Sequence, residues 1–150
     1  MSFGPQFAKL TSTTAATGGE QSAPRREGIF FNNTGAAITD GEMVGIDTTD
    51  TTYGLGASIA PTTGVADTFN VVGCADEDIP SGKFGRVVIS GVKVGVAATA
   101  VAITAGHGVQ LSGTGGKVET QGGAAGTEAV VGFALATSAG TTVDVYLTLG

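Results

Sequence analysis

The sequence is poor in the side chains from which most catalytic and metal sites are built. Its 150 residues include one cysteine, one histidine and no tryptophan, and only 13% of them are charged. Because Cys74 is alone, no disulfide bond can form within the chain. Cys74 and His107 are also too few for a zinc site, which needs about three or four protein ligands. We therefore expect no catalytic, cofactor-binding or metal-binding residues, no cofactor, and a protein that is not an enzyme.

Long apolar runs and an amino-terminal targeting signal are missing as well. The apolar stretches are interrupted by glycine, threonine or lysine, as in residues 91–96, and none approaches the roughly 18 residues of a membrane-spanning helix. The start MSFGPQFAKLTSTT has neither the basic segment nor the apolar segment of a secretory signal. These absences argue against a membrane partner and against secretion by a cleaved signal.

Short catalytic motifs are absent too. The chain has neither the G-x-S-x-G motif nor the phosphate-binding P-loop, and the run GTGGK at 113–117 is typical of a hairpin turn. His107 lies between two glycines and is expected in a turn, whereas Cys74 is expected to be buried in a strand. The acidic run Asp76–Asp78 is expected to form a solvated loop. Whether it binds a cation stays open, since Ca²⁺ takes about 6–8 oxygen ligands.

Charge is distributed unevenly along the chain. The formal net charge is −6. Residues 1–30 carry three basic and two acidic side chains, whereas residues 31–150 carry four basic and eleven acidic ones. Phosphate contacts need clustered lysine and arginine, so an acidic body of this kind is not expected to bind nucleic acid.

What the chain has in abundance is glycine, with 26 residues, in short β-forming runs separated by turn residues. The clearest run is 141–149, where Val143, Val145 and Leu147 alternate with polar residues and would share one buried face. Helix signals are weak throughout. The pattern predicts an all-β fold, either a small β-barrel or a β-sandwich. The expected strands are residues 28–32, 42–47, 69–75, 85–96, 108–112, 117–120, 129–136 and 141–149.

The pattern divides the chain into an arm at 1–28 and a β domain at 29–150. The arm shows no strand or helix periodicity and contains the low-complexity stretch 11–19. A disordered tail is one interpretation, but such tails are usually poor in aromatic residues. The alternative is an extended arm that becomes ordered on a partner. Its expected partner-binding residues are Phe3, Phe7, Lys9, Arg25 and Arg26.

The β domain also contains two similar segments, which predict a diverged duplication with units at about 36–91 and 101–149. Residues 38–47 resemble 103–112, residues 71–75 resemble 130–134, and residues 86–90 resemble 144–148, in the same order in both halves. Arg86 and Asp144 occupy matching positions. They are expected to be two unrelated exposed charges rather than an ion pair.

Several of these runs resemble a known family. Four of them together look like head decoration (capsid cement) proteins of tailed bacteriophages: Gly41–Asp47, Val71–Ala75, Ile79–Gly82 and Arg86–Gly91. The closing runs Val131–Ala134 and Val143–Leu147 are similar to the last strands of that family. The resemblance covers about residues 35–150 and rests on the style and order of these runs.

The resemblance implies a structural virion protein, made in the host cytoplasm, that binds the outside of a phage capsid. Its implied partners are the major capsid protein and itself, as a homotrimer, and its implied task is to stabilise the capsid by bridging neighbouring coat subunits. The family often has an amino-terminal segment that orders on the shell, which agrees with the arm at 1–28. The alternatives are a tail or fibre structural module and a small glycan-binding β domain.

Overall fold

The computed structural model describes residues 25–62, 70–122, 130–138 and 140–149, and it confirms an all-β fold. The described residues form no helix, and hence none of the length and apolarity needed to cross a membrane. The strands of the described part are β1 (Arg26–Asn32), β2 (Met43–Ile46), β3 (Ser58–Pro61), β4 (Val71–Ala75), β5 (Phe84–Ala97), β6 (Gly108–Leu111), β7 (Val118–Thr120), β8 (Val130–Ala134) and β9 (Thr142–Leu147).

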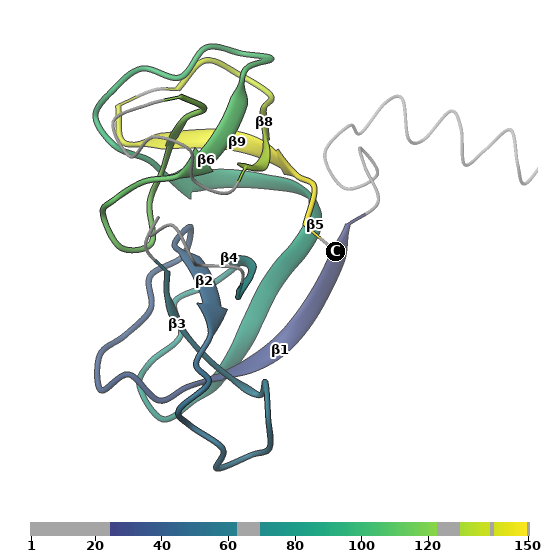
Figure 1. Cartoon of the computed structure of the whole chain (residues 1–150), viewed down its shortest axis with the longest axis vertical. Coiled ribbons are helices and arrows are strands. Elements are labelled where there is room, and N and C mark those ends of the chain that lie inside the picture. The colour runs from purple at the N-terminus through teal and green to yellow at the C-terminus, as the bar shows by residue number, and fades with distance from the viewer. Residues whose placement is uncertain (1–24, 63–69, 123–129, 139, 150) are drawn as a thin grey trace, which may run out of the picture.

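The first five strands close into a barrel. Their order is β1-β3-β2-β4-β5, and β1 returns to pair with β5. β1 and β3 run parallel, and the other four pairings are antiparallel. This first barrel forms the lower part of the molecule in Figure 1. A closed barrel leaves none of these strands as an unpaired sheet edge.

The 14-residue strand β5 continues into a second set of strands. Its second half pairs with β9, and the order β5-β9-β8-β6-β7 follows. Ala98, just after β5, makes a parallel bridge to Val118 of β7, which brings the two ends of this second barrel together. In Figure 1 β5 runs from the lower barrel into the upper one, which holds β6, β8 and β9.

The two barrels repeat the same pairings. Val44 of β2 pairs with Gly73 of β4, and Val109 of β6 pairs with Gly132 of β8. In both pairs a β-bulge follows directly after the valine. β3 pairs with β2 as β7 pairs with β6. On its other side β3 runs parallel to β1, and Val118 of β7 likewise makes a parallel bridge to Ala98, which follows β5. The structure thus has matching halves where the sequence predicts two units.

Each barrel encloses its own apolar core. The first contains Ile38, Val44, Ile59, Ala75, Ile79 and Val87. The second contains Val96, Ala98, Ile103, Val109, Leu111, Val118, Val131, Ala134, Val143, Val145 and Leu147, and joins Met43, Cys74 and Val88 of the first barrel. The predicted alternation in the last strand is therefore confirmed, since Val143, Val145 and Leu147 are all buried.

The sequence reading missed one strand. β3 contains Ala60 and Pro61, which are poor strand formers, and it has only four residues. It forms because it pairs on both sides, with β1 and β2. The other expected strands are present, with ends that differ by a few residues, and the expected strand ends at 69 and 129 lie outside the described residues.

Two equivalent glycines allow neighbouring strands to approach closely. A Cβ atom on Gly73 would lie 2.0 Å from the carbonyl oxygen of Val88, and one on Gly132 would lie 2.0 Å from that of Tyr146. Both obstacles are backbone atoms of a paired strand, so neither could move without disturbing the sheet. A side chain at either position is therefore incompatible with the present strand spacing.

We predict that Gly132→Ala lowers the free energy of unfolding by about 1–3 kcal/mol, the usual cost of overpacking. Gly113→Ala is the matched control, because a Cβ atom there meets no heavy atom within 4 Å. Urea or thermal unfolding of both variants measures the difference. Equal stability of the two variants would contradict the proposed close approach.

Candidate functional site

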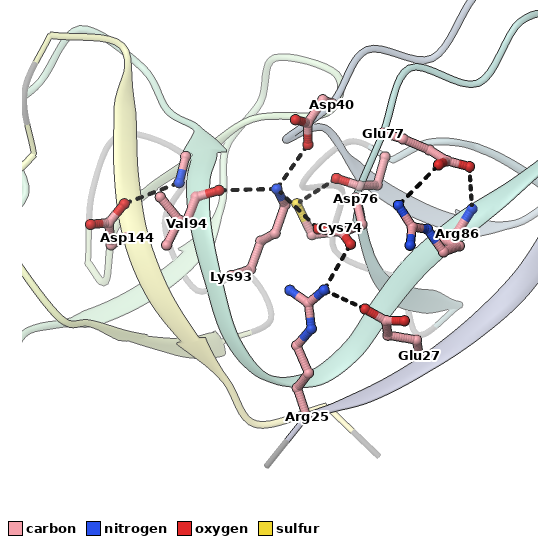
Figure 2. A network of polar contacts seen from close by, with 12 residues as sticks. Arg25, Glu27, Asp40, Cys74, Asp76, Glu77, Arg86, Lys93, Val94 and Asp144 are labelled. Atoms are coloured by element: carbon pink, nitrogen blue, oxygen red, sulfur yellow. Dashed lines mark hydrogen bonds and ion pairs between the residues drawn. The ribbon is translucent and has the colours of Figure 1, made fainter. Parts of the chain in front are cut away.

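A buried lysine lies at the junction of the two barrels. Lys93, in the second half of β5, is only 5% exposed. Its Nζ donates hydrogen bonds to Asp40 Oδ1 at 2.8 Å and to the carbonyl oxygen of Val94 at 3.0 Å, and it lies 3.5 Å from Asp76 Oδ1 (Figure 2). Burial lowers the pKa of Lys93, but the hydrogen bond to Asp40 and the electrostatic interactions with Cys74, Asp40 and Asp76 together outweigh it, so the pKa is raised overall. Lys93 therefore stays protonated and serves as the positive centre of an ion-pair network.

The acidic run Asp76–Asp78 belongs to the same network rather than to a free solvated loop. Asp76 Oδ2 accepts a hydrogen bond from Arg25 at 2.9 Å, and Glu77 Oε2 pairs with Arg86 at 3.2 Å. Asp78 Oδ1 accepts the backbone amide hydrogen of Asp40 at 2.8 Å. The described residues contain no group of three or more histidine, cysteine, aspartate or glutamate side chains placed to hold a metal ion. These carboxylates are thus engaged by cations and amides of the chain itself.

Cys74 lies beside Lys93 but is not poised to react. It is fully buried, as the sequence predicts, and burial raises the pKa of its thiol to about 12, although the nearby charge of Lys93 opposes this. The thiolate is the nucleophilic form of cysteine. Cys74 is therefore protonated and inert at neutral pH, and it acts as an apolar contact between the barrels.

The remaining predicted site residues are placed as follows. Phe3, Phe7 and Lys9 lie outside the described residues, so their partner contacts stay predictions. Arg26 is exposed at the start of β1, and Arg25 is held on the barrel by Asp76 and Glu27. β1 thus begins within the range expected for the arm, and residues 26–28 are part of the first barrel.

Arg86 and Asp144 do not pair with each other, as expected. Arg86 is bound by Glu77, and Asp144 Oδ1 accepts the amide hydrogen of Gly95 at 3.0 Å (Figure 2). His107 follows a turn in which its amide donates to the carbonyl oxygen of Thr104 at 3.1 Å. These residues hold the local backbone.

An aromatic cluster with one buried and two exposed rings lies at the far end of the first barrel. The rings of Phe31, Tyr53 and Phe84 contact one another at centroid distances of 4.7–5.1 Å. Tyr53 is 56% exposed and Leu55, in the same β2–β3 loop, is 89% exposed. This loop projects at the lower end of the molecule in Figure 1. An exposed apolar surface of this kind marks a candidate contact site.

Asp50 fixes the shape of this β2–β3 loop. Its carboxylate accepts hydrogen bonds from the hydroxyls of Ser58 and Thr52 and from the amide of Thr52. The hydrogen bond from Ser58, followed by those from Thr52, lowers the pKa of Asp50 below its ordinary value. The loop that presents Tyr53 and Leu55 is therefore ordered by a charged side chain.

A second apolar surface lies on β8 and β9 of the second barrel. Phe133 stacks on Tyr146 with a centroid distance of 5.3 Å and an interplanar angle of 12°. Val130, Phe133 and Leu135 are each at least 40% exposed. A shallow pocket of about 400 Å³ adjoins Gly108, the β-sheet partner of Phe133. It is lined by His107, Gly108, Thr120, Gln121 and Gly122.

Sequence reasoning missed Lys93, Asp40 and both apolar surfaces. Lys93 stands between two valines inside an expected strand, and a charged residue in such an apolar run is a signal for a buried charge with an ion-pair partner. Asp40 is 53 residues away, so nothing local in the sequence links the two. The apolar surfaces depend on how the two barrels pack, because packing decides which strand faces are covered and which stay exposed. The periodicity of the sequence alone does not predict this packing.

Comparisons with known proteins give little further information. No family model matches the chain, and no significant match is found among curated proteins. Among solved structures, the chain is similar to the N base of head fiber gp8.5 of bacteriophage phi29, at 16% sequence identity and a TM-score of 0.48. The alignment covers 83% of this chain and 95% of that chain. A likeness of this size supports no conclusion about function.

We predict that Lys93→Met lowers the free energy of unfolding by about 2–3 kcal/mol, because it leaves carboxylates at the barrel junction without their cation. Lys83→Met is the matched control, since Lys83 is exposed. Chemical denaturation at neutral pH measures both.

The pH dependence of this effect has a defined sign. The raised pKa of Lys93 means that its stabilisation is complete below the ordinary lysine value of 10.5 and is lost as the pH rises through the folded-state pKa. The stability difference between wild type and Lys93→Met should therefore shrink above about pH 10.5. A difference that stays constant through this range would contradict the role given to Lys93.

On the acid side, we predict that Asp50 contributes stability above its unfolded-state pKa of 3.8, and that this is lost as the pH falls through the lower folded-state pKa. Asp50→Asn should be less stable than wild type at pH 7, and the two should converge as the pH falls below about 4. Thermal melts across pH 2–7 measure the convergence, with Asp144→Asn as a carboxylate control in the other barrel. An Asp50→Asn variant as stable as wild type at pH 7 would refute it.

Proposed function

We propose that this chain is a structural virion protein that binds the outside of a phage capsid and bridges neighbouring coat subunits. The partner would be the major capsid protein, and a homotrimer would be the binding unit. This proposal starts from the resemblance of residues 35–150 to capsid decoration proteins. A tail or fibre module would use the same kind of surfaces, and the test below separates the two.

The observation that carries the proposal is the contrast between the polar and the apolar groups of the described residues. The side chains with the greatest chemical reactivity are buried or paired within the chain. Cys74 is buried and protonated, and Lys93 forms an ion pair with Asp76. By contrast, large apolar side chains on both barrels are exposed, among them Leu55 and Phe133. Such a chain is suited to bind other proteins rather than to carry out a reaction.

The amino-terminal residues supply a second means of attachment. Arg25, the first described residue, is anchored to the first barrel by Asp76 and Glu27. Phe3 and Phe7 could fill pockets on a coat subunit, while Lys9 meets acidic groups. An extended segment can add a strand to a sheet of its partner. Three such arms on one trimer would raise the overall affinity through effective concentration.

We predict that the full chain co-sediments with empty capsids of its phage, and that a Phe3→Ser, Phe7→Ser double substitution weakens this binding at least about tenfold through loss of two apolar anchors. Val101→Ser is the matched control, because Val101 is an exposed apolar side chain of the barrel. Circular dichroism checks that all variants stay folded.

Three outcomes would overturn parts of the proposal. Binding to isolated tails or fibres but not to capsids would favour the module alternative. Undiminished capsid binding by the double variant would remove the role of Phe3 and Phe7. Selective binding to a glycan array, with no binding to phage particles, would favour a glycan-binding domain.

A further inference from the structure

The two barrels of one chain contact each other through non-equivalent surfaces. The β6–β7 turn of the second barrel lies against the outside of the first. Met43 N donates to Gly116 O at 2.8 Å, and Gly116 N donates to Thr62 O at 2.7 Å. Met43 is fully buried, together with Cys74 and Val88 on the neighbouring strands. This outer face of the first barrel, made of Met43, Thr62, Cys74 and Val88, is here called the covered face.

The strand register identifies the equivalent face on the second barrel. Met43 pairs with Cys74 as Gly108 pairs with Phe133. Ala75 pairs with Val87 as Ala134 pairs with Val145, which places Tyr146 at the position of Val88. The amide of Thr62 donates to the carbonyl of Met43 as that of Gln121 donates to the carbonyl of Gly108. We call the second set, Gly108, Gln121, Phe133 and Tyr146, the open face.

The open face has the chemistry of a contact surface. Phe133 is 40% exposed and stacks on Tyr146. Gly108 and Gln121 line the 400 Å³ pocket, so the hollow occurs where Gly116 of the turn is seated on the covered face. Large exposed aromatic residues beside a hollow are typical of the central part of protein interfaces.

The equivalent of the inserted turn lies on the first barrel and, among the residues that the structure describes, is not packed against the second barrel. β2 and β3 correspond to β6 and β7, so the β2–β3 loop corresponds to the turn that contains Gly116. This loop is the longer of the two and exposes Tyr53 and Leu55, which are 56% and 89% exposed. Within the described part of the chain, one such turn and one such face are thus not packed against the other barrel, and they belong to opposite barrels. Two copies can combine them head to tail, which is a heterologous contact, or reciprocally in a two-fold dimer.

We propose that the open face of one copy binds the β2–β3 loop of a second copy of this chain, with Leu55 and Tyr53 packed on Phe133 and Tyr146. The contact continues between molecules the barrel-on-barrel packing that the chain already makes within itself. Repetition of a head-to-tail contact closes a ring when the rotation allows, and the trimer implied by the family resemblance is such a ring. This inference rests on the self-association part of the proposed function and is independent of capsid binding.

The test uses two full-length variants, each with one damaged surface. Leu55→Asp damages the loop, and Phe133→Ser damages the open face. Val101→Asp, at a 63% exposed valine on neither surface, is the control. Analytical ultracentrifugation without capsids should give an oligomer for wild type and for Val101→Asp. Each of the other two variants should associate at least about 100-fold more weakly, because central apolar contacts dominate interface energy.

Mixing the two variants distinguishes a contact between the loop and the open face from a face-to-face or loop-to-loop contact. Each variant keeps one intact surface, so an equimolar mixture should form a one-to-one complex that grows no further. Absence of this complex, a monomeric wild type, or an oligomer unaffected by Phe133→Ser would each overturn the proposal. Because no capsid is present in this experiment, a negative result would overturn only the proposed contact between copies. The proposed capsid binding is tested separately, by co-sedimentation.

Discussion

The strand β5 is the constraint on which the rest of the structure depends. Its first half closes the first barrel against β1, and its second half begins the second barrel against β9. Gly91 and Gly95 have positive φ values within this strand, a conformation that glycine adopts without strain. Because β5 is one continuous strand that belongs to both barrels, the backbone itself connects the two barrels. Lys93 lies in the second half of β5, at the junction between them. Its ion pairs with Asp40 and Asp76 then join β5 to two loops of the first barrel.

The matching halves have diverged in their cores and on their outer faces. In the first barrel Ile79 fills the space above Gly85, where an added Cβ would lie 2.4 Å from the isoleucine Cγ1. In the second barrel Ser138 is the counterpart of Ile79, and Val143 is the counterpart of Gly85. The larger side chain of the pair is therefore at the first position in one barrel and at the second position in the other. The outer faces diverge without such compensation. Cys74 is buried between the barrels, whereas its counterpart Phe133 is exposed.

Much of this architecture follows from the sequence, because its causes are local. Glycine-rich turns, alternating valines in β9 and the repeated runs at 38–47 and 103–112 predict an all-β chain with two similar halves. The strand β3 escaped prediction, since Pro61 disfavours it locally and only its two neighbours stabilise it. The junction network also escaped, because it joins residues that are far apart in the chain. The exposed faces depend on how the barrels pack, which is a tertiary property, and the partner contacts of Phe3 and Phe7 remain predictions.

The central claim is that this chain works by contact, with its amino-terminal residues on a shell and its barrels on one another. A density map of the native phage particle at side-chain resolution tests this most directly. The account predicts copies of the chain on the outer capsid surface, with residues 1–24 against coat subunits and Phe133 covered by a neighbouring copy. A map in which the chain is absent from the capsid, or in which residues 1–24 touch no coat subunit and Phe133 faces solvent, would contradict it.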